Sequence, residues 1–242
     1  MIPLVHGAIG ARTRRDPRRE KGSWNAARSV RILYHRLGDA FGPQEWWPAS
    51  SSFEVMVGAI LTQATNWHNV EQAITRLKAA RRLHPHRLLA MPRGHLEEAI
   101  RPTGYFREKA ERLRRFTVWF VTRYGGISHR MFRRPWRLLR EELLALNGIG
   151  PETADTMLLY AGGQPVFVID AYTTRILRRH RLIGWRDRYE DIQQLIVRAL
   201  PKQVSLYNEF HALLVAAGKR FCHRTRPDCE HCPLGDLPHT SR

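Results

Sequence analysis

The sequence predicts an all-α protein of about ten helices, on two observations. First, apolar residues recur at i, i+3, i+4 and i+7, a spacing that places them on one buried face of a helix. Four segments show it: Phe53, Met56, Val57, Ile60 and Leu61; Leu113, Phe116, Phe120, Val121 and Tyr124; Ile192, Leu195, Ile196 and Ala199; and Leu206, Phe210, Leu213, Leu214 and Ala217. Second, no stretch alternates as a strand would, and the apolar run at 165–170 is too short and solitary to build a sheet.

The chain is expected to begin with a basic segment and to continue as two helical lobes. Residues 1–26 are rich in arginine and have little periodic apolar content, which predicts a flexible basic arm or a solvated tail without a role. Turns marked by glycine or proline separate the helical segments that follow. We expect one lobe at 53–164 and a second formed by 27–52 and 165–242, which ends in a cysteine-rich loop.

The composition points to a polyanionic partner. Of the 242 residues, 43% are hydrophobic, enough to bury a sizeable core. Forty Lys and Arg stand against 22 Asp and Glu, a formal charge of +18, which favours nucleic acid because binding releases counterions from phosphate. No apolar run approaches the roughly 20 residues that span a bilayer, and no basic region marks a secretory signal. We therefore expect an intracellular monomer, cytoplasmic or nucleoid-associated, that binds no membrane.

Residues 143–161 predict a hairpin of two helices. Two apolar helical patterns meet at a tight turn, which consists of Asn147, Gly148, Ile149 and Gly150. We expect both glycine positions to exclude a Cβ, so that the chain can reverse and bring free N–H groups close to a ligand. Ile149 would fill the space between the helices, and Pro151 suits the first position of the second helix. The turn is then an anion site for a DNA phosphate, or an ordinary αα-hairpin with glycine caps.

Several motifs in order resemble one family of DNA repair enzymes. The hairpin reads L-x-G-I-G and leads to T-A-D, and further motifs lie at 53–65 (FEVMVGAILTQAT), 104–113 (GYFREKAERL) and 218–222 (GKRFC). Together they resemble the helix-hairpin-helix DNA glycosylases typified by endonuclease III. The resemblance implies a two-lobed helical fold and, as partner, double-stranded DNA that carries a damaged base. It also implies that six residues contact DNA: Gln63, Asn147, Gly148, Ile149, Gly150 and Thr153.

Asp170 matches the catalytic aspartate of that family, which follows the hairpin after a loop rich in glycine and proline. Cleavage of an N-glycosidic bond gives the sugar oxocarbenium character, and a fixed carboxylate can stabilise this charge and orient the attacking water. The residues after Asp170 begin a helix, so the same side chain suits a structural N-cap. The two roles are compatible at one residue.

Glu152 departs from the pattern of the bifunctional members. These carry a lysine at this hairpin position, and its amine forms a Schiff base with the sugar before the strand is cleaved. A carboxylate cannot form an imine. The substitution therefore predicts a monofunctional glycosylase that uses water, unless Lys219 or another amine reaches the same place.

Three tryptophans predict a stacking pocket for an extruded base. Trp46, Trp47 and Pro48 precede the first helix of the 53–164 lobe, and Trp67 follows Gln63 by four residues. The combination resembles the 3-methyladenine glycosylases of the endonuclease III branch, where these positions line the base pocket. Indoles attract a cationic base such as 3-methyladenine by cation–π interaction. Each tryptophan could otherwise be a core residue. Gln63 is either a wedge that fills the space vacated in the duplex or a buried amide within a helix.

The cysteines crowd the C-terminus, where Cys222, Cys229 and Cys232 have the spacing C-x6-C-x2-C. Family members with a [4Fe–4S] cluster continue with a fourth cysteine, and that position is Pro238 here. His239 lies one residue later and could replace it, since histidine ligates some clusters. There are two alternatives. The cysteines bind zinc together with His223, His231 or His239, or they bind no metal at all.

Together, these expectations predict a base-excision-repair glycosylase. It would hydrolyse the glycosidic bond of alkylated purines and need no cofactor for catalysis. One alternative is an endonuclease III-like glycosylase and lyase for oxidised pyrimidines. The other is a non-enzymatic DNA-binding protein that merely retains the hairpin.

Overall fold

The computed structural model describes residues 17–44, 46–47 and 49–240. Within these residues the chain forms twelve α-helices, one 3-10 turn and one π-helical segment, and it forms no strand. The all-α class predicted from the sequence is thereby confirmed. None of the described helices is long and apolar enough to cross a membrane.

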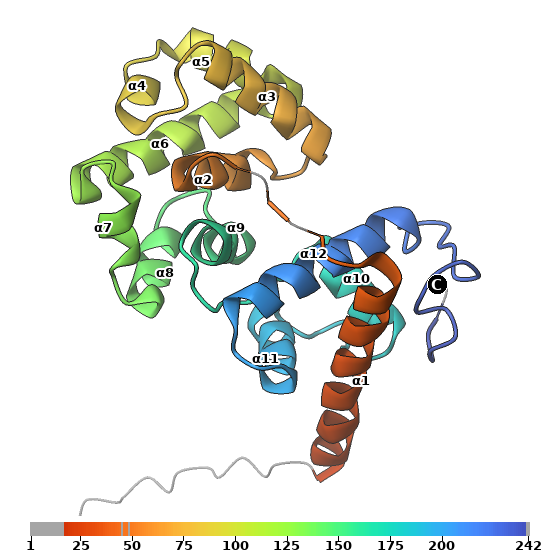
Figure 1. The fold of residues 1–242 in the computed structure, drawn as a ribbon. Helices are drawn as coiled ribbons and strands as arrows, with labels where there is room; N and C mark the ends of the chain where they lie inside the picture. The colour runs from red at the N-terminus through yellow and green to blue at the C-terminus, as the bar shows by residue number, and fades with distance from the viewer. Residues whose placement is uncertain (1–16, 45, 48, 241–242) are drawn as a thin grey trace, which may run out of the picture.

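The elements follow one another along the chain in this order (Figure 1): α1 Pro17–Phe41, α2 Ser52–Leu61, α3 Trp67–Ala79, α4 Pro85–Leu89, α5 Arg93–Ile100, η1 Arg101–Thr103, α6 Phe106–Tyr124, α7 Ser128–Phe132, α8 Trp136–Leu144, α9 Pro151–Thr156, η2 Met157–Ala161, α10 Ala171–Arg179, α11 Tyr189–Ala199 and α12 Val204–Arg220. Helices α4 and α7 have five residues each, which is too few to show a helical period in the sequence.

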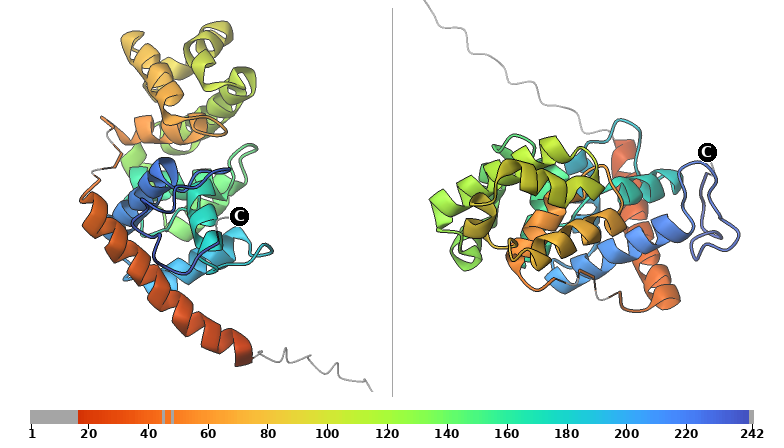
Figure 2. Two further views of the ribbon diagram at one scale, coloured as in Figure 1. Left: turned by 90° about the vertical axis from the view of Figure 1, so that its right-hand side faces the viewer. Right: turned by 90° about the horizontal axis from the view of Figure 1, so that it is seen from above.

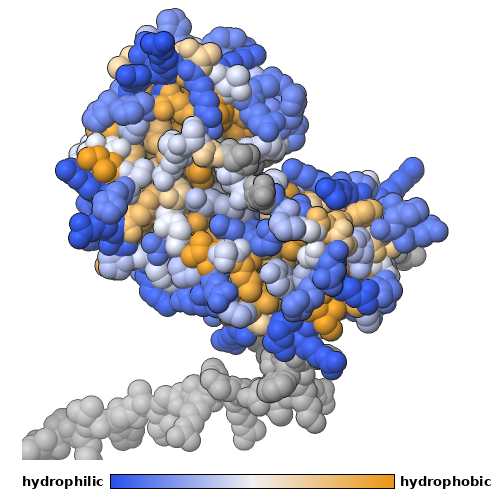
Figure 3. Space-filling model, in the orientation of Figure 1, coloured by the Kyte–Doolittle hydropathy of each residue, from blue (hydrophilic) through white to orange (hydrophobic). Residues whose placement is uncertain are grey.

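Buried apolar side chains form two clusters. The first runs from Phe53 to Val166 and is built mainly by α2 to α9, which we call the hairpin lobe. The second is built mainly by α1 and α10 to α12, which we call the terminal lobe. Leu158 belongs to the first cluster and Leu159 to the second, so η2 crosses from one lobe to the other. Figure 3 shows hydrophilic residues over most of one face and a notch where the two lobes meet.

The first helix is longer than the sequence predicts. Residues 17–26, assigned to a flexible arm over 1–26, form the first turns of α1, which ends at Phe41. This stretch contains good helix formers such as Arg, Glu and Lys, and Pro17 occupies a first helical position, where it has no N–H to satisfy. Local helix propensity thus outweighs the weak apolar pattern. Residues 1–16 lie outside the described residues.

A buried carboxylate joins the hairpin to the terminal lobe. Asp155 of α9 is fully buried and accepts hydrogen bonds from Arg140 of α8 at 2.6 and 3.2 Å. It accepts another from Gln193 of α11 at 2.8 Å, and the same amide donates to the carbonyl of Phe167 at 2.6 Å. Because a buried carboxylate needs partners, this network fixes α8, α9 and α11 relative to the non-helical segment 163–170.

The turn between α8 and α9 requires one glycine. Gly148 has φ +92°, and a Cβ built there would lie 2.6 Å from Cγ of Arg112. Gly150 has φ −94°, and a Cβ built there would meet no atom within 4 Å. The prediction that both positions exclude a Cβ is therefore wrong at Gly150, where the backbone is extended and the space is open. Ile149 is buried in the hairpin lobe, so it can meet a ligand only through its backbone.

The two glycines should respond differently to alanine. We expect Gly148→Ala to lower the free energy of unfolding by about 1 to 3 kcal/mol, because a positive φ and a close contact with Arg112 both oppose a side chain. Gly150→Ala should change it by no more than about 0.5 kcal/mol. Denaturant unfolding followed by circular dichroism measures both values, and equal losses would contradict this account of the turn.

Candidate active site

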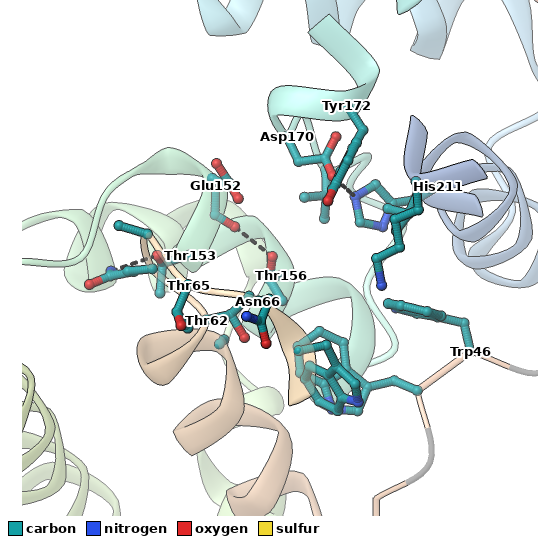
Figure 4. Close-up of a pocket in the computed structure, with 18 of the residues that line it drawn as sticks. Trp46, Thr62, Thr65, Asn66, Glu152, Thr153, Thr156, Asp170, Tyr172 and His211 are labelled. Carbon is teal, nitrogen blue, oxygen red and sulfur yellow. Dashed lines mark hydrogen bonds and ion pairs between the residues drawn. The ribbon is translucent and has the colours of Figure 1, made fainter. Parts of the chain in front are cut away.

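A cavity of about 650 Å³ opens where the two lobes and the segment 46–47 meet (Figure 4). Its chemically active lining comes from five separate stretches of chain: Trp46, Trp47, Gln63, Trp67, Glu71, Glu152, Thr153, Asp170, Tyr172, His211 and Lys219. The folding therefore brings together the aspartate, the indoles, Gln63 and Glu152 that the sequence singles out. Pro48 lies outside the described residues. The turn 147–150 and the cysteines do not line this cavity.

Asp170 stands at the wall of the cavity and begins α10. Its Oδ1 accepts a hydrogen bond from the N–H of Thr173 at 2.7 Å, so the N-cap role predicted from the sequence is present. Its Oδ2 lies 3.6 Å from Nε2 of His211, a little beyond hydrogen-bond distance. Burial acts to raise the pKa of Asp170, but His211 and the N–H of Thr173 outweigh burial and hold this pKa below its usual value. The carboxylate is therefore ionised at neutral pH.

His211 and Tyr160 form a relay behind Asp170 that the sequence analysis did not find. The hydroxyl of Tyr160 lies 2.6 Å from Nδ1 of His211. Burial, together with the charge of Asp170, raises the pKa of Tyr160 well above its usual value, so the phenol keeps its proton and has an O–H that Nδ1 can accept. In the tautomer in which Nδ1 accepts this O–H, the ring proton is on Nε2, on the side of Asp170. A polar residue on the buried face of α12 was the available signal.

Glu152 occupies the expected position of the lyase lysine and faces the cavity (Figure 4). Its side chain is exposed to the cavity and has no side-chain hydrogen-bond partner among the described residues. Desolvation by the surrounding walls and the negative charge of Asp170 raise the pKa of Glu152 to about 7. This carboxyl therefore changes its charge in the neutral range, whereas Asp170 does not.

The three indoles gather on one side of the cavity. The ring centroids of Trp47 and Trp67 lie 4.9 Å apart at 79°, and Trp46 lies 6.5 Å from Trp47 and 6.3 Å from Trp67. Gly58 of α2 allows this packing, because a Cβ at that position would lie 3.0 Å from Cζ2 of Trp47. The indole N–H of Trp67 donates to Glu71 at 2.7 Å, which fixes its ring.

Lys219 also reaches the cavity, from the end of α12. Its Nζ lies 5.3 Å from the ring centroid of Trp46, in a cation–π contact. The amine of Lys219 and the carboxylate of Asp170 therefore line one space, as the sequence analysis allowed. One face of Trp46 thus has a cationic partner, and Trp47 and Trp67 line the same cavity without one.

Gln63 is held by the hairpin and by α6. Its amide N–H group donates to the carbonyl of Gly148 at 3.0 Å and to Oγ1 of Thr153 at 2.9 Å. Its carbonyl oxygen accepts from Arg112 at 2.7 Å. To enter a duplex as a wedge, Gln63 would have to exchange these three contacts for contacts with DNA. Thr153 is buried, whereas Asn147 is exposed beside the turn.

The three cysteines line a separate small cavity of about 20 Å³ together with His239. Burial raises the pKa of Cys232, and the thiols of Cys222 and Cys229 raise it further, so the three sulfur atoms lie near one another. Nδ1 of His239 lies 2.8 Å from the carbonyl of Leu237, which leaves Nε2 for a ligand. Three thiols and one imidazole are donor types that iron–sulfur clusters use. As these side chains stand, no three His, Cys, Asp or Glu among the described residues are arranged to hold a metal ion.

Comparison with known proteins identifies the family. Residues 57–202 match the family model described as HhH-GPD superfamily base excision DNA repair protein. The chain is 42% identical over 206 residues to a DNA repair glycosylase of Methanocaldococcus jannaschii, which covers 85% of this chain and 93% of the relative. It is 32% identical over 184 residues to endonuclease III of Thermotoga maritima, which covers 75% and 80% of the two chains.

The fold matches solved structures of the same group. The crystal structure of the 3-methyladenine DNA glycosylase of Helicobacter pylori bound to 1,N6-ethenoadenine superposes with a TM-score of 0.68 at 25% identity, over 82% of this chain and 97% of that one. This finding, the matched family model and the 42% identical relative agree with the resemblance drawn from the motifs. The chain therefore belongs to the HhH-GPD superfamily of base excision DNA repair proteins and is an enzyme of the DNA glycosylase class.

Proposed function

We propose that this glycosylase releases alkylated purines such as 3-methyladenine from duplex DNA by hydrolysis and leaves the strand uncut. The observation that carries the proposal is the ionised carboxylate of Asp170 at the wall of a cavity that also contains three gathered indoles. At about 650 Å³, the cavity falls within the roughly 300 to 1,000 Å³ typical of ligand sites. An intracellular, nucleoid-associated location follows from such a substrate and stays a prediction.

Asp170 is the group that stabilises positive charge on the sugar. The oxocarbenium character of the transition state places this charge near the anomeric carbon. The carboxylate is held on one side by Thr173 and on the other by His211, so it need not reorganise during the reaction. When Tyr160 donates its O–H to Nδ1 of His211, the imidazole presents its Nε2–H to Asp170. The carboxylate of Asp170 then keeps its negative charge.

Glu152 is suited to take a proton from the attacking water. It faces the cavity without a hydrogen-bond partner of its own, and with a pKa of about 7 it is ionised in a large fraction of molecules at neutral pH. An alkylated purine leaves as a neutral base without being protonated, so the reaction needs a base for water more than an acid for the leaving group. Asp170 can thus stabilise the charge on the sugar while Glu152 accepts a proton from the water.

The charge of the cavity favours a cationic base. Glu71, Glu152 and Asp170 contribute carboxylates, whereas Lys219 contributes one ammonium group that lies against Trp46. A 3-methylated adenine carries a positive charge, so it gains from these carboxylates and from the faces of Trp47 and Trp67. A neutral oxidised pyrimidine gains neither.

The second candidate function is that of a glycosylase and lyase for oxidised pyrimidines. One observation favours it: Lys219 lines the same cavity as Asp170 and offers an amine. The hairpin position itself holds Glu152, which cannot form an imine. The remaining alternative, a DNA-binding protein without activity, does not agree with the family.

The hairpin and Gln63 are proposed to contact the DNA. The turn that contains Asn147, Gly148, Ile149 and Gly150 offers backbone N–H groups to a phosphate, which reads no base sequence. Gln63 and Thr153 join the floor of the cavity to this turn, so they can couple phosphate binding to base extrusion.

We further propose that Cys222, Cys229 and Cys232 hold a structural [4Fe–4S] cluster with His239 in place of the usual fourth cysteine. Such a cluster would fix the loop after α12 and take no part in bond cleavage. Arg179, whose guanidinium donates to Sγ of Cys222 at 3.0 Å, supports the sulfur donors from α10.

Replacing Asp170 by asparagine tests the catalytic assignment. Asn is also a good N-cap, so folding and DNA affinity should stay close to wild type, while base release should fall roughly 100-fold or more with loss of the charge. Single-turnover release of 3-methyladenine from duplex DNA measures the rate. Asp191→Asn, an exposed first-turn residue of α11, is the control and should leave the rate unchanged. Near-normal release by Asp170→Asn would refute the mechanism.

The pH dependence should report Glu152. This carboxyl is protonated below its pKa of about 7, so we expect base release to decline as pH falls through the neutral range. The Glu152→Gln variant should lose this inflection and run slower than wild type above pH 7, because Gln cannot accept a proton from water. Asp170, whose pKa is lowered, should not add an inflection in this range. An unchanged profile in Glu152→Gln would remove Glu152 from the reaction.

A panel of damaged duplexes distinguishes the two candidate functions. We expect release of 3-methyladenine and no release of thymine glycol, with strand breaks that develop only after hot alkali, because no imine forms. Replacing Trp47 or Trp67 by alanine should weaken recognition by about 1 to 3 kcal/mol, the worth of one base–aromatic stack.

Borohydride trapping is the matched control for this panel. The wild-type protein should form no covalent adduct with DNA. Efficient trapping that disappears in Lys219→Ala would establish the lyase alternative instead.

The cysteine site can be tested by composition. Purified protein should contain about four iron atoms and no zinc, with broad absorption near about 400 nm. His239→Ala should lower iron content and cluster lifetime more than His231→Ala, whose side chain pairs with Asp228 and does not line the cavity. Zinc in place of iron, or neither metal, would disprove the cluster.

A further inference from the structure

Trp185 is an unusually exposed aromatic residue outside the active site. It lies in the loop between α10 and α11 and is 83% exposed, more than the other large apolar side chains of the described residues. The guanidinium of Arg178 lies 5.0 Å from its ring centroid, which supports one face of the indole and leaves the other open. Exposure of a flat apolar ring to water is energetically unfavourable, so it indicates a binding surface.

The indole ends a groove of about 940 Å³ that is rich in arginine. We call it the arginine groove; it runs beside α10, between the loop that holds Trp185 and the C-terminal loop. Arg175 and Arg179 also line it, but they hold the backbone of the C-terminal loop. Arg178, Arg181 and Arg224 form no side-chain hydrogen bond or ion pair among the described residues. Asp187 is the one carboxylate in the lining, and it accepts the N–H of Gly184 at 2.7 Å.

The arginine groove is continuous with the active site. An intervening hollow shares Asp170, Tyr172 and Lys219 with the catalytic cavity. The same hollow shares Ala171, Arg175 and Arg224 with the arginine groove. Figure 2 shows α10 extending toward the C-terminal loop. Its nine residues form a helix about 14 Å long, the length of about four base pairs of duplex.

We propose that the arginine groove binds the DNA strand on one side of the extruded nucleotide, with the open face of Trp185, beyond the end of α10, packed against the deoxyriboses of that strand. The unpaired guanidinium groups of Arg178, Arg181 and Arg224 match a row of phosphates. DNA is the occupant because the groove starts at the catalytic cavity and carries an excess of unpaired positive charge. The inference rests on the DNA substrate of the proposed function and does not depend on which lesion is released.

The test uses three duplexes with a tetrahydrofuran abasic analogue, placed centrally, near the 5′ end or near the 3′ end of one strand. Trp185→Ala should bind the central duplex and one of the end duplexes roughly tenfold more weakly, the scale of one lost apolar contact, and the other end duplex as wild type does. Trp185→Phe should stay within about threefold of wild type, because it keeps an aromatic face. Ile127→Ala removes an exposed apolar side chain beyond α6, at the opposite end of the molecule from α10, and should bind all three normally.

Salt dependence gives a second readout. Arg181→Gln and Arg224→Gln should each lower the slope of log affinity against log salt by about one for the affected duplexes. Equal weakening on all three duplexes, or none, would overturn the proposal. So would unchanged DNA binding with altered self-association of Trp185→Ala in sedimentation, which would assign the surface to a protein partner. Because no duplex in this test contains a damaged base to be released, failure to release alkylated bases would leave its result intact.

Discussion

The buried carboxylate of Asp155 is the contact on which the geometry of the site depends. It lies at the end of the hairpin and accepts hydrogen bonds from α8 and α11, so one charge joins the two lobes. The amide of Gln193 that donates to Asp155 also donates to the carbonyl of Phe167, three residues before Asp170. Loss of one partner of a buried ion pair costs about 3 to 5 kcal/mol, which is a large share of the stability of a domain. The distance between the hairpin and the carboxylate of Asp170 is thus set by an electrostatic contact that tolerates little displacement.

Asp170 combines two tasks that make the same physical demand. A helix N-cap needs an oxygen fixed beside free N–H groups, and stabilisation of an oxocarbenium needs a carboxylate that stays charged and does not reorganise. The N–H of Thr173 and the imidazole of His211 meet both needs, because each lowers the pKa of Asp170 against the effect of burial. Glu152 lacks such partners, and its pKa rises to about 7. Two carboxylates of one cavity thus have different protonation behaviour because the polar groups around them differ.

The sequence predicts what depends on local pattern and misses what depends on contacts between distant segments. The all-α class follows from apolar spacing, and Asp170, Glu152 and the tryptophans follow from ordered motifs that the cavity brings together. The relay of Tyr160 and His211 was missed, because 51 residues separate the two and no pattern in the sequence links them. The role of Gly150 was overestimated, because only the backbone angles distinguish it from Gly148. The helical start of α1 was missed because its apolar pattern is weak, although its residues favour a helix.

The net charge of +18 and the carboxylates of the cavity act on different parts of the substrate. A polyanion approaching three carboxylates would be repelled, so the phosphates must stay outside the cavity that holds Glu71, Glu152 and Asp170. Arginines outside the cavity, along α10 and the C-terminal loop, supply the attraction for the backbone. Extrusion of one nucleotide then brings only a base and a sugar to the carboxylates. There, low dielectric strengthens their interaction with a cationic base and with a positively charged sugar. Because the arginines lie outside the cavity and the carboxylates inside it, one protein can attract the DNA backbone and also stabilise a cationic base and sugar in its cavity.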